Sequence, residues 1–498
     1  MDENRSELMR QLIEMAIACG RKRKSAQTGY LHHCHGLNEQ EPHLPIPLVE
    51  NFLYALALLR SRMVENINEA KIVLEGLLHF QNTQDGEIAH GNFPIYVHDY
   101  PVCKDRFTAL HVAAAICWIL KLFHQILGQE LKARLEKSLS LAVRHVLKVH
   151  SEKAAPFPAA IKVAAVAINA GKLLADNGLE TQGNALLEDL HSQSEEMGWY
   201  CPEAIGEIMV ALAMVYPRLG DSPWSAFWEY VQKTWHHKTG SYIGPALKEW
   251  QLGDEPQTTA YDLFLGYLSG NLSMRAKKDN LVHLEVALIP PLEDLLPLPH
   301  YPQLYEGTIN GAKWSVFQEQ NYAYSCVDQG AIAINPVFAK GFHPLKLVWG
   351  DLQRVHTFVC QDGNTKSATF TPSGANIDID CILGNLIEFE DREQSREVAF
   401  FFDACEGIEF QVAGHKSSTF QPDELLSLRS AGLSMQLTFY LKEGDGRFLG
   451  HRMMGNRPAQ IGAKGPTRYN AYDWQLFLRT VRRSEECRVG VRLKIEEV

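Results

Sequence analysis

The stretch "PPLEDLLPLPHYP", from Pro290 to Pro302, separates two halves of the chain that have different hydrophobic periods. Its closely spaced prolines exclude a helix interior and favour a semi-rigid linker. Before it, apolar residues recur every three or four positions, whereas after it they alternate with polar residues. We therefore predict an all-helical domain over residues 1–275, a linker over 276–303 and an all-β domain over 304–498.

The N-terminal half predicts about ten helices of about 12 to 22 residues, joined by loops of alternating length. Pro47 to Glu65, "PLVENFLYALALLRSRMVE", shows the pattern, with proline at the helix start. The stretch "AAIKVAAVAINAG" (159–171) is apolar on more than one face. Such a helix is buried between neighbours. Helices paired through long and short loops favour an incomplete α/α toroid, in which the loops at one end shape a cleft.

The C-terminal half contains many short runs of alternating apolar and polar residues, each bounded by Gly, Pro, Asp or Asn. Examples are "NIDIDCIL" (376–383) and "LSMQLTFYL" (433–441). Strands repeated at such short spacing indicate an antiparallel β-sandwich. The predicted fold is thus α then β, with a toroid followed by a sandwich.

Length, composition and charge exclude several classes of protein. With 498 residues the chain is too long for one ordinary core, and its net charge of −11 argues against nucleic acid as a partner. The N-terminal sequence lacks the order of a signal peptide, and no stretch approaches the length of a membrane span, so we expect a cytoplasmic protein. Ten cysteines without a CxxC pair suit a reducing compartment. Phosphate-loop, dinucleotide-binding and GxSxG motifs are missing, and we expect no cofactor.

Three stretches carry a resemblance to a known class of enzymes: "LLHFQNTQDGE" (77–87), "WSVFQEQNYAYSC" (314–326) and "GRFLGHRMMGNRP" (446–458). Together with the domain order, they resemble polysaccharide lyases of the heparinase II/III, hyaluronate and alginate lyase kind. The paired-asparagine signature of the heparinases is absent. The resemblance implies an anionic oligosaccharide as ligand and cleavage beside a uronic acid by β-elimination.

The loop "HGNFPIYVHDYP" (90–101) contains the groups that this elimination needs. A lyase must neutralise the uronate carboxylate, remove the proton at C5 and protonate the leaving oxygen. Candidates are Asn92 as neutraliser, His98 or Tyr96 as base and Tyr100 as proton donor. Arg106, just inside the next helix, is a candidate partner for a substrate carboxylate. The same residues also suit a structured surface loop that satisfies its own hydrogen bonds.

Two further loops supply candidate substrate-binding residues. Trp235 to Glu255, "WHHKTGSYIGPALKEWQLGDE", contains Tyr242 as a possible catalytic group, Glu249 and the possible sugar-stacking Trp250. The loop around residues 446–458 offers a basic, hydrogen-bonding surface, whose candidates are His451, Arg452, Asn456 and Arg457. Each of these residues is also common in ordinary connections between secondary-structure elements.

The stretch "GYLHHCHG" (29–36) brings three histidines and a cysteine together. Zinc ligands from one segment normally need two to four intervening residues, and adjacent histidines point apart. We therefore predict no metal site here, and favour a loop that contributes one histidine to the cleft.

Two other functions remain open from the sequence. A glycoside hydrolase on the same scaffold needs two carboxylates, one of them protonated. Its candidates are Asp85, Glu87, Asp99 and Glu249. A non-catalytic scaffold that binds glycan or protein is the other alternative. The substrate's identity and the oligomeric state are not readable from the chain.

Overall fold

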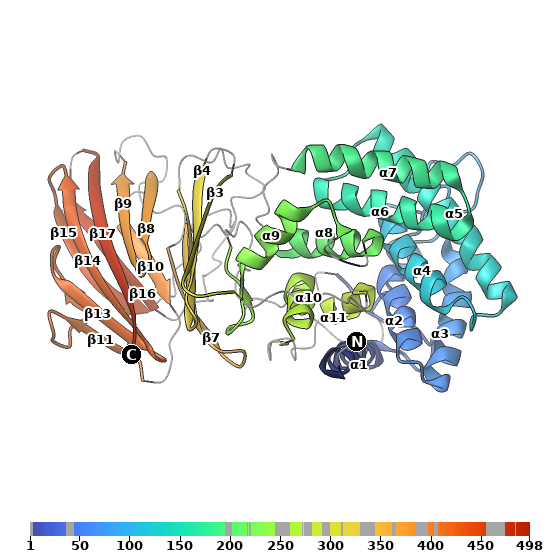
Figure 1. Cartoon of the computed structure of the whole chain (residues 1–498), viewed down its shortest axis with the longest axis horizontal. Coiled ribbons are helices and arrows are strands. Elements are labelled where there is room, and N and C mark those ends of the chain that lie inside the picture. Colours follow the sequence, from blue (N-terminus) through green and yellow to red (C-terminus); the bar gives the residue numbers. More distant parts are fainter. Residues whose placement is uncertain are drawn as a thin grey trace.

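The structure is a computed structural model in which a helical half is followed by two large antiparallel sheets (Figure 1). This is the predicted order of α then β. The described residues are 3–35, 44–194, 202–216, 218, 221–244, 259–270, 272, 281–290, 299–309, 312–328, 344–360, 365–384, 397–402, 407–454, 474–483 and 485–498.

The helical stretches of the sequence form a series of antiparallel pairs. The α-helices in the described residues are α1 (Glu3–Arg23), α2 (Leu48–Arg60), α3 (Val64–Leu77), α4 (Thr108–Phe123), α5 (Gln129–Glu152), α6 (Phe157–Leu174), α7 (Asn177–Ser192), α8 (Pro202–Val215), α9 (Ser225–Lys233), α10 (Ala260–Ser269) and α11 (Val282–Glu285). Short 3₁₀ turns are η1 (Leu78–Phe80), η2 (Val97–Asp99) and η6 (Val286–Leu288).

The even-numbered helices α2, α4, α6, α8 and α10 form an inner layer, because each packs against the next even-numbered helix. In α6, every residue from Ala160 to Gly171 is buried, whereas α5 buries only one stripe. Helices α2, α4 and α6 are each paired with the outer helix that follows after a short connection, α3, α5 and α7, so these inner helices run in the same direction. Their first residues therefore lie at one end of the helical half, which we call the inner rim.

Small residues allow the inner helices to approach their neighbours closely. A Cβ at Gly183 of α7 would lie 2.8 Å from Ile168 Cγ1 and 2.9 Å from the backbone oxygen of Ala164, both in α6. Only glycine fits such a contact without a shift of backbone. Helices packed this tightly leave little room for polar side chains along their length, and Asn169 of α6 is accommodated by donating to the Ala165 carbonyl of its own helix at 2.9 Å.

Arg60 joins the first and last helices of this half. Its Nη1 donates to the carbonyls of Ala287 and Ile289, at 2.7 and 2.6 Å, and its Nη2 lies 3.0 Å from Met9 Sδ. Burial lowers the pKa of Arg60 to about 10. The guanidinium thereby ties η6 to α2 and α1. Both α11 and η6 belong to the stretch 276–303 that is predicted as a linker, and both pack against the helices.

The strands form a two-layer sandwich with one additional hairpin. The hairpin strands are β1 (Trp235–His236) and β2 (Ser241–Tyr242). The nine-stranded sheet has the order β12-β15-β16-β10-β7-β6-β5-β4-β3 and the six-stranded sheet the order β11-β13-β14-β17-β9-β8. The strand bounds are β3 (Gln303–Ile309), β4 (Ala312–Gln318), β5 (Tyr322–Val327), β6 (Leu345–Gly350), β7 (Val355–Cys360), β8 (Ser367–Ser373), β9 (Asn376–Leu383), β10 (Glu397–Phe402), β11 (Glu409–Val412), β12 (Thr419–Phe420), β13 (Leu425–Ser430), β14 (Leu433–Glu443), β15 (Arg447–Met454), β16 (Trp474–Arg482) and β17 (Cys487–Glu497).

In the strands of the nine-stranded sheet that face the helical half, alternation divides the side chains between two cores. In the nine-stranded sheet, Leu347 and Trp349 face the core between the sheets, whereas Val348 packs with the core of the helical half. The helical half lies beside β3 and β4 (Figure 1), and Trp314 of β4 joins its core. The two halves therefore share buried apolar surface, which holds them together.

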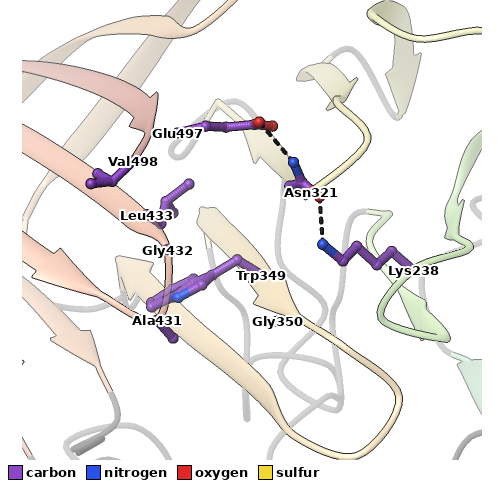
Figure 2. Close-up of a pocket in the computed structure, with 9 residues that line it drawn as sticks. All are labelled: Lys238, Asn321, Trp349, Gly350, Ala431, Gly432, Leu433, Glu497 and Val498. Atoms are coloured by element: carbon purple, nitrogen blue, oxygen red, sulfur yellow. Dashed lines mark hydrogen bonds between the residues drawn. The ribbon is translucent and has the colours of Figure 1, made fainter. Parts of the chain in front are cut away.

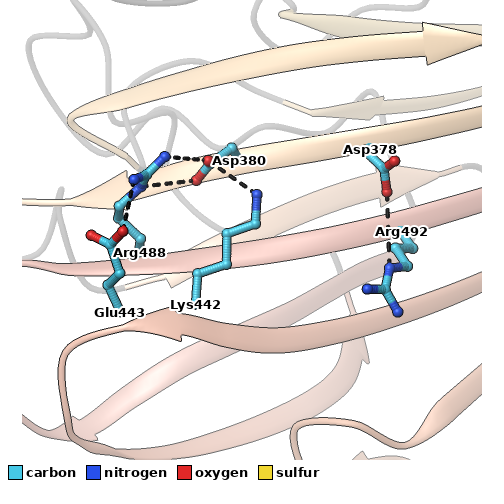
Figure 3. A network of polar contacts seen from close by, with 6 residues as sticks. All are labelled: Asp378, Asp380, Lys442, Glu443, Arg488 and Arg492. Atoms are coloured by element: carbon cyan, nitrogen blue, oxygen red, sulfur yellow. Dashed lines mark hydrogen bonds and ion pairs between the residues drawn. The ribbon is translucent and has the colours of Figure 1, made fainter.

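The outer face of the six-stranded sheet is a charged surface whose ions are already paired (Figure 3). Asp380 of β9 accepts from Arg488 at 2.5 Å and from Lys442 at 3.0 Å, and Arg488 also contacts Glu443 at 3.0 Å. Exposed pairs of this kind stabilise the fold little, and their balanced charge offers no basic patch for an anionic polymer.

Of the helices in the described residues, α6 alone has the length and hydropathy of a membrane-crossing helix. It has 18 residues with a mean hydropathy of 1.4, but 67% of it is buried inside the protein. Its apolar composition agrees with its place in the inner layer.

Replacing Arg60 by methionine is expected to lower the free energy of unfolding by about 3 kcal/mol, because buried carbonyls lose their donor. Denaturant unfolding measures this loss. The control is Arg144→Met, whose side chain is 59% exposed and pairs with Asp176 at 2.6 Å. It should cost less than about 1 kcal/mol. Equal losses in the two variants would contradict the role assigned to Arg60.

Candidate active site

The loop between α3 and α4 is fixed to the inner rim by buried polar contacts. Gln81 Nε2 donates to the carbonyls of Gly91 and Ser138, at 2.9 and 3.0 Å. Gly91 has a φ of +89°, and a Cβ there would lie 2.3 Å from the carbonyl oxygen of Leu141. This position therefore requires glycine. The loop is thus held against α5 before it reaches its histidines and tyrosines.

Asn92 anchors the same loop to the start of α4. Its Oδ1 accepts from the Ala109 amide at 3.0 Å, and its Nδ2 donates to the Asp105 carbonyl at 2.8 Å. The side chain is 1% exposed. Asp105 in turn accepts from the Phe107 amide at 3.1 Å. Both ends of the Asn92 amide therefore bind backbone groups, so the side chain fastens the loop to the start of α4.

Beyond this anchor, the loop pairs with the segment that precedes α2. Pro47 forms an antiparallel bridge with Tyr96, and the Leu48 amide donates to the Ile95 carbonyl at 2.9 Å. These contacts place the "HHCH" stretch beside the loop of residues 90–101. Two segments that are separated in the sequence thereby meet at the N-terminal end of α2.

Five side chains form a cluster at this meeting point, which we call the tyrosine–histidine cluster. The Tyr96 and His98 rings stack, with centroids 5.6 Å apart and an angle of 14° between their planes. The backbone amide of His35 donates to Tyr96 Oη at 2.9 Å, and His35 Nε2 lies 3.0 Å from Glu50 Oε1. His33 completes the cluster, with its ring centroid 5.5 Å from that of His35.

The surroundings of the individual side chains shift the pKa values within the cluster in different directions. Burial raises the pKa of Tyr96, so its hydroxyl stays protonated at neutral pH. The hydrogen bond to Glu50 raises the pKa of His35, whereas burial lowers the pKa of His33. The cluster therefore holds a protonated phenol, a histidine that favours its cationic form and one that favours its neutral form. Such separation is typical of acid–base sites.

His32 and its neighbours do not converge as metal ligands would. His32 is buried, with Nδ1 2.6 Å from the Leu44 carbonyl oxygen and Nε2 2.8 Å from Thr28 Oγ1. Both of its ring nitrogens are used by the local fold. Among the described residues, no group of three or more His, Cys, Asp and Glu side chains could hold a metal ion.

The other predicted residues of this region are exposed and have partners outside the cluster. Tyr100 is 41% exposed and contacts the Phe80 ring edge-on, with centroids 5.9 Å apart. Arg106 forms an exposed ion pair with Glu152 at 2.6 Å. The structure thus brings Tyr96 and His98 into contact and leaves Tyr100 and Arg106 with other partners.

Tyr242 and Arg452 lie in two other neighbourhoods. Tyr242 is 2% exposed, and its hydroxyl is 2.7 Å from that of Tyr230, within the core beside the sheet. Arg452 of β15 stacks its guanidinium 4.6 Å from the Trp474 ring and 5.1 Å from the Phe410 ring. His451 neighbours Phe477. The predicted residues Glu249, Trp250, Asn456 and Arg457 lie outside the described residues.

A pocket of about 230 Å³ lies where the β1–β2 hairpin meets both sheets (Figure 2). Lys238 donates to Asn321 Oδ1, and Asn321 Nδ2 donates to Glu497 Oε2 at 2.7 Å. Trp349 lines the opposite side and donates from its indole nitrogen to the Ser430 carbonyl at 3.0 Å. The polar groups that line this pocket already bind one another. Their hydrogen bonds link the hairpin of the helical half to the sandwich.

The carboxylates proposed for hydrolysis have ordinary surface environments. Asp85 is fully exposed, and Asp99 pairs with Lys104 at 3.3 Å. Glu87 accepts from Asn82 Nδ2 at 2.6 Å. A general acid in a hydrolase needs a carboxyl in an environment that favours its protonated form. These three carboxylates are exposed or paired with a donor.

Glu50 is the member of the cluster that sequence reasoning missed. It occupies the first turn of α2, where an acidic residue also suits the helix dipole. The one available signal was its position at the start of the predicted helix 47–65, which places it at a rim of the toroid.

Replacing Glu50 by glutamine should lower the pKa of His35 toward its ordinary value and leave His33 titrating below His35. Titration of the imidazole resonances from ~pH 5 to ~pH 8 measures both. Since the pair raises the pKa of His35, its stabilisation is complete below the unfolded pKa and is lost as pH rises through the folded pKa. With half of His35 exposed, the loss should stay below about 1 kcal/mol. An unchanged His35 titration in the variant would contradict this assignment.

Neither a protein-family model nor a curated protein matches the chain. Among solved structures it is similar to a Streptomyces coelicolor chondroitin AC lyase in complex with chondroitin sulphate, at 9% identity and a TM-score of 0.49, covering 99% of this chain and 80% of that one. A heparinase III matches at 9% identity and a TM-score of 0.46, covering 98% and 84%. A heparan sulfate lyase from Pedobacter heparinus matches at 8% identity and a TM-score of 0.27, covering 89% and 90%. These structures are of the class that the sequence resembles.

Proposed function

We propose that this protein is a lyase that cleaves uronate-containing oligosaccharides by β-elimination at the tyrosine–histidine cluster. The observation that carries the proposal is the stacked pair of Tyr96 and His98 at the inner rim, with the protonated phenol beside an exposed imidazole. Proton removal and proton donation need two such groups next to each other.

His98 suits the role of base, because its imidazole is exposed and can accept a proton from a substrate bound at the rim. It removes the proton at C5 of the uronate, the electrons of that C–H bond form the C4=C5 double bond, and the C4–O bond breaks. Tyr96 suits the role of acid. Its raised pKa keeps the proton that the leaving oxygen receives.

His35 and Glu50 support the donor. The His35 amide donates to Tyr96 Oη, which fixes the position of the phenol. The same hydrogen bond stabilises the negative charge that develops on the oxygen as the proton leaves. Glu50 holds the His35 side chain, and Asn92 positions the loop from behind.

The proposal fits the remaining features of the chain. An anionic oligosaccharide needs only a few locally placed cations, so the net charge of −11 does not argue against it. In the described residues eight cysteines lie outside any disulfide, which agrees with a reducing compartment such as the cytoplasm. Hydrolysis is less well supported, because the carboxylates proposed for it lie exposed or paired.

The decisive measurement is the absorbance of unsaturated product when the purified protein is incubated with a panel of uronate polymers and oligosaccharides. Tyr96→Phe and His98→Ala should each lower kcat by about 100-fold or more. The matched controls are Tyr440→Phe on the outer sheet face and His124→Ala just beyond the other end of α4, and both should keep full activity.

Two results would overturn the proposal. One is cleavage that yields new reducing ends without a double bond, which would identify a hydrolase. The other is oligosaccharide binding without any cleavage, which would identify a glycan-binding scaffold. A Tyr100→Phe variant that loses more activity than Tyr96→Phe would move the proton donor to Tyr100.

A further inference from the structure

Three titratable side chains from three inner helices meet near the rim, outside the tyrosine–histidine cluster. His111 belongs to α4, Lys162 to α6 and Glu207 to α8, and each lies within the first two turns of its helix. Lys162 Nζ is 2.9 Å from His111 Nδ1 and 3.5 Å from Glu207 Oε1. We call this group the His–Lys–Glu array.

The array interrupts an otherwise apolar interior. From Thr108 to Leu120, His111 is the one residue of α4 that is not buried. Lys162 is the one charged residue in the buried run from Ala160 to Gly171, and its side chain is 9% exposed. Placing a lysine there costs desolvation energy that the fold recovers only through its partners. Packing of the helices alone does not require either residue.

The contacts fix the state of the His111 ring. The positive charge of Lys162, followed by burial, lowers the pKa of His111 to about 3, so the imidazole is neutral near pH 7. Lysine carries only donors, and it donates to Nδ1, so the proton of the neutral ring is on Nε2. Within the described residues, His111 forms no other hydrogen bond. Its Nε2–H therefore remains available for a ligand.

A neutral imidazole backed by a cation is suited to an oxygen anion. It donates a directed hydrogen bond, and the charge behind it adds electrostatic attraction in a site of low dielectric. Glu207 balances the charge of Lys162 and holds the ammonium in place, while its own side chain remains 28% exposed. The ligand class that fits the array is thus an oxyanion, either planar or tetrahedral, bound at the rim.

We propose that the His–Lys–Glu array is a carboxylate subsite, in which His111 Nε2–H binds the carboxylate of a uronate unit. The inference rests on the proposed function for the choice of uronate as the ligand. His111 is the binding residue, and Lys162 and Glu207 position it.

Binding of D-glucuronate, with D-glucose as the uncharged match, tests the subsite without any need for turnover. The wild-type protein should prefer glucuronate, and His111→Leu and Lys162→Met should each reduce this preference by about tenfold or more. His111→Gln keeps an N–H donor near the position of Nε2 and should retain most of it. The control is Lys172→Met on the same helix, whose side chain is 57% exposed, and it should bind like the wild type.

A second readout separates positioning from mere packing. In the Lys162→Met variant, the loss of the neighbouring charge should raise the pKa of His111 well above about 3, as seen in its imidazole resonances. A folded Lys162→Met protein that keeps its preference for glucuronate, or a His111→Gln protein that loses it as fully as His111→Leu, would overturn the inference. Absence of lyase product together with an intact, His111-dependent preference would overturn only the proposed reaction.

Discussion

The parallel packing of the inner helices is the constraint on which the rest of the structure depends. Helices such as α4 and α6 are surrounded by protein along almost their whole length, so their sides must be apolar and small. Alanine and glycine meet this requirement, as the contact of Gly183 with α6 shows. Polar side chains then have room mainly at the helix ends, where unpaired backbone amides also favour them. A chemically rich rim follows from an apolar interior.

The rim receives its chemistry from two sources. The helices themselves supply Glu50, His111 and Lys162 from their first two turns, held rigidly by packing. The connection into α4 supplies Tyr96 and His98, and it is stiffened by buried hydrogen bonds of Gln81 and Asn92. A site built in this way has its reacting groups on fixed elements, which catalysis by proton transfer needs. Asn92 contributes by supporting the loop. An asparagine side chain is suited to this as well as to binding a substrate.

The sandwich completes the structure through a different kind of contact. Trp314 and Val348 bury apolar surface against the helical half, while Lys238, Asn321 and Glu497 add a polar tie between the hairpin and both sheets. The outer face of the six-stranded sheet carries paired charges and is suited to solvent (Figure 3). The described part of the sandwich therefore supports the helical half, and Arg452 is held there between two aromatic rings.

The sequence by itself determined the class and order of the two halves, because hydrophobic period is a local property that each segment carries independently. It also predicted the loop of residues 90–101 as chemically rich, and two of its residues, Tyr96 and His98, do meet. Only the tertiary structure decided the partners. His35 and Tyr96 are 61 positions apart and His111 and Lys162 are 51 apart. The first contact arises from the pairing of two loop segments and the second from helix packing, and no local pattern records either. For the same reason the sequence could not separate Asn92, whose amide is used by backbone, from a residue free to bind substrate.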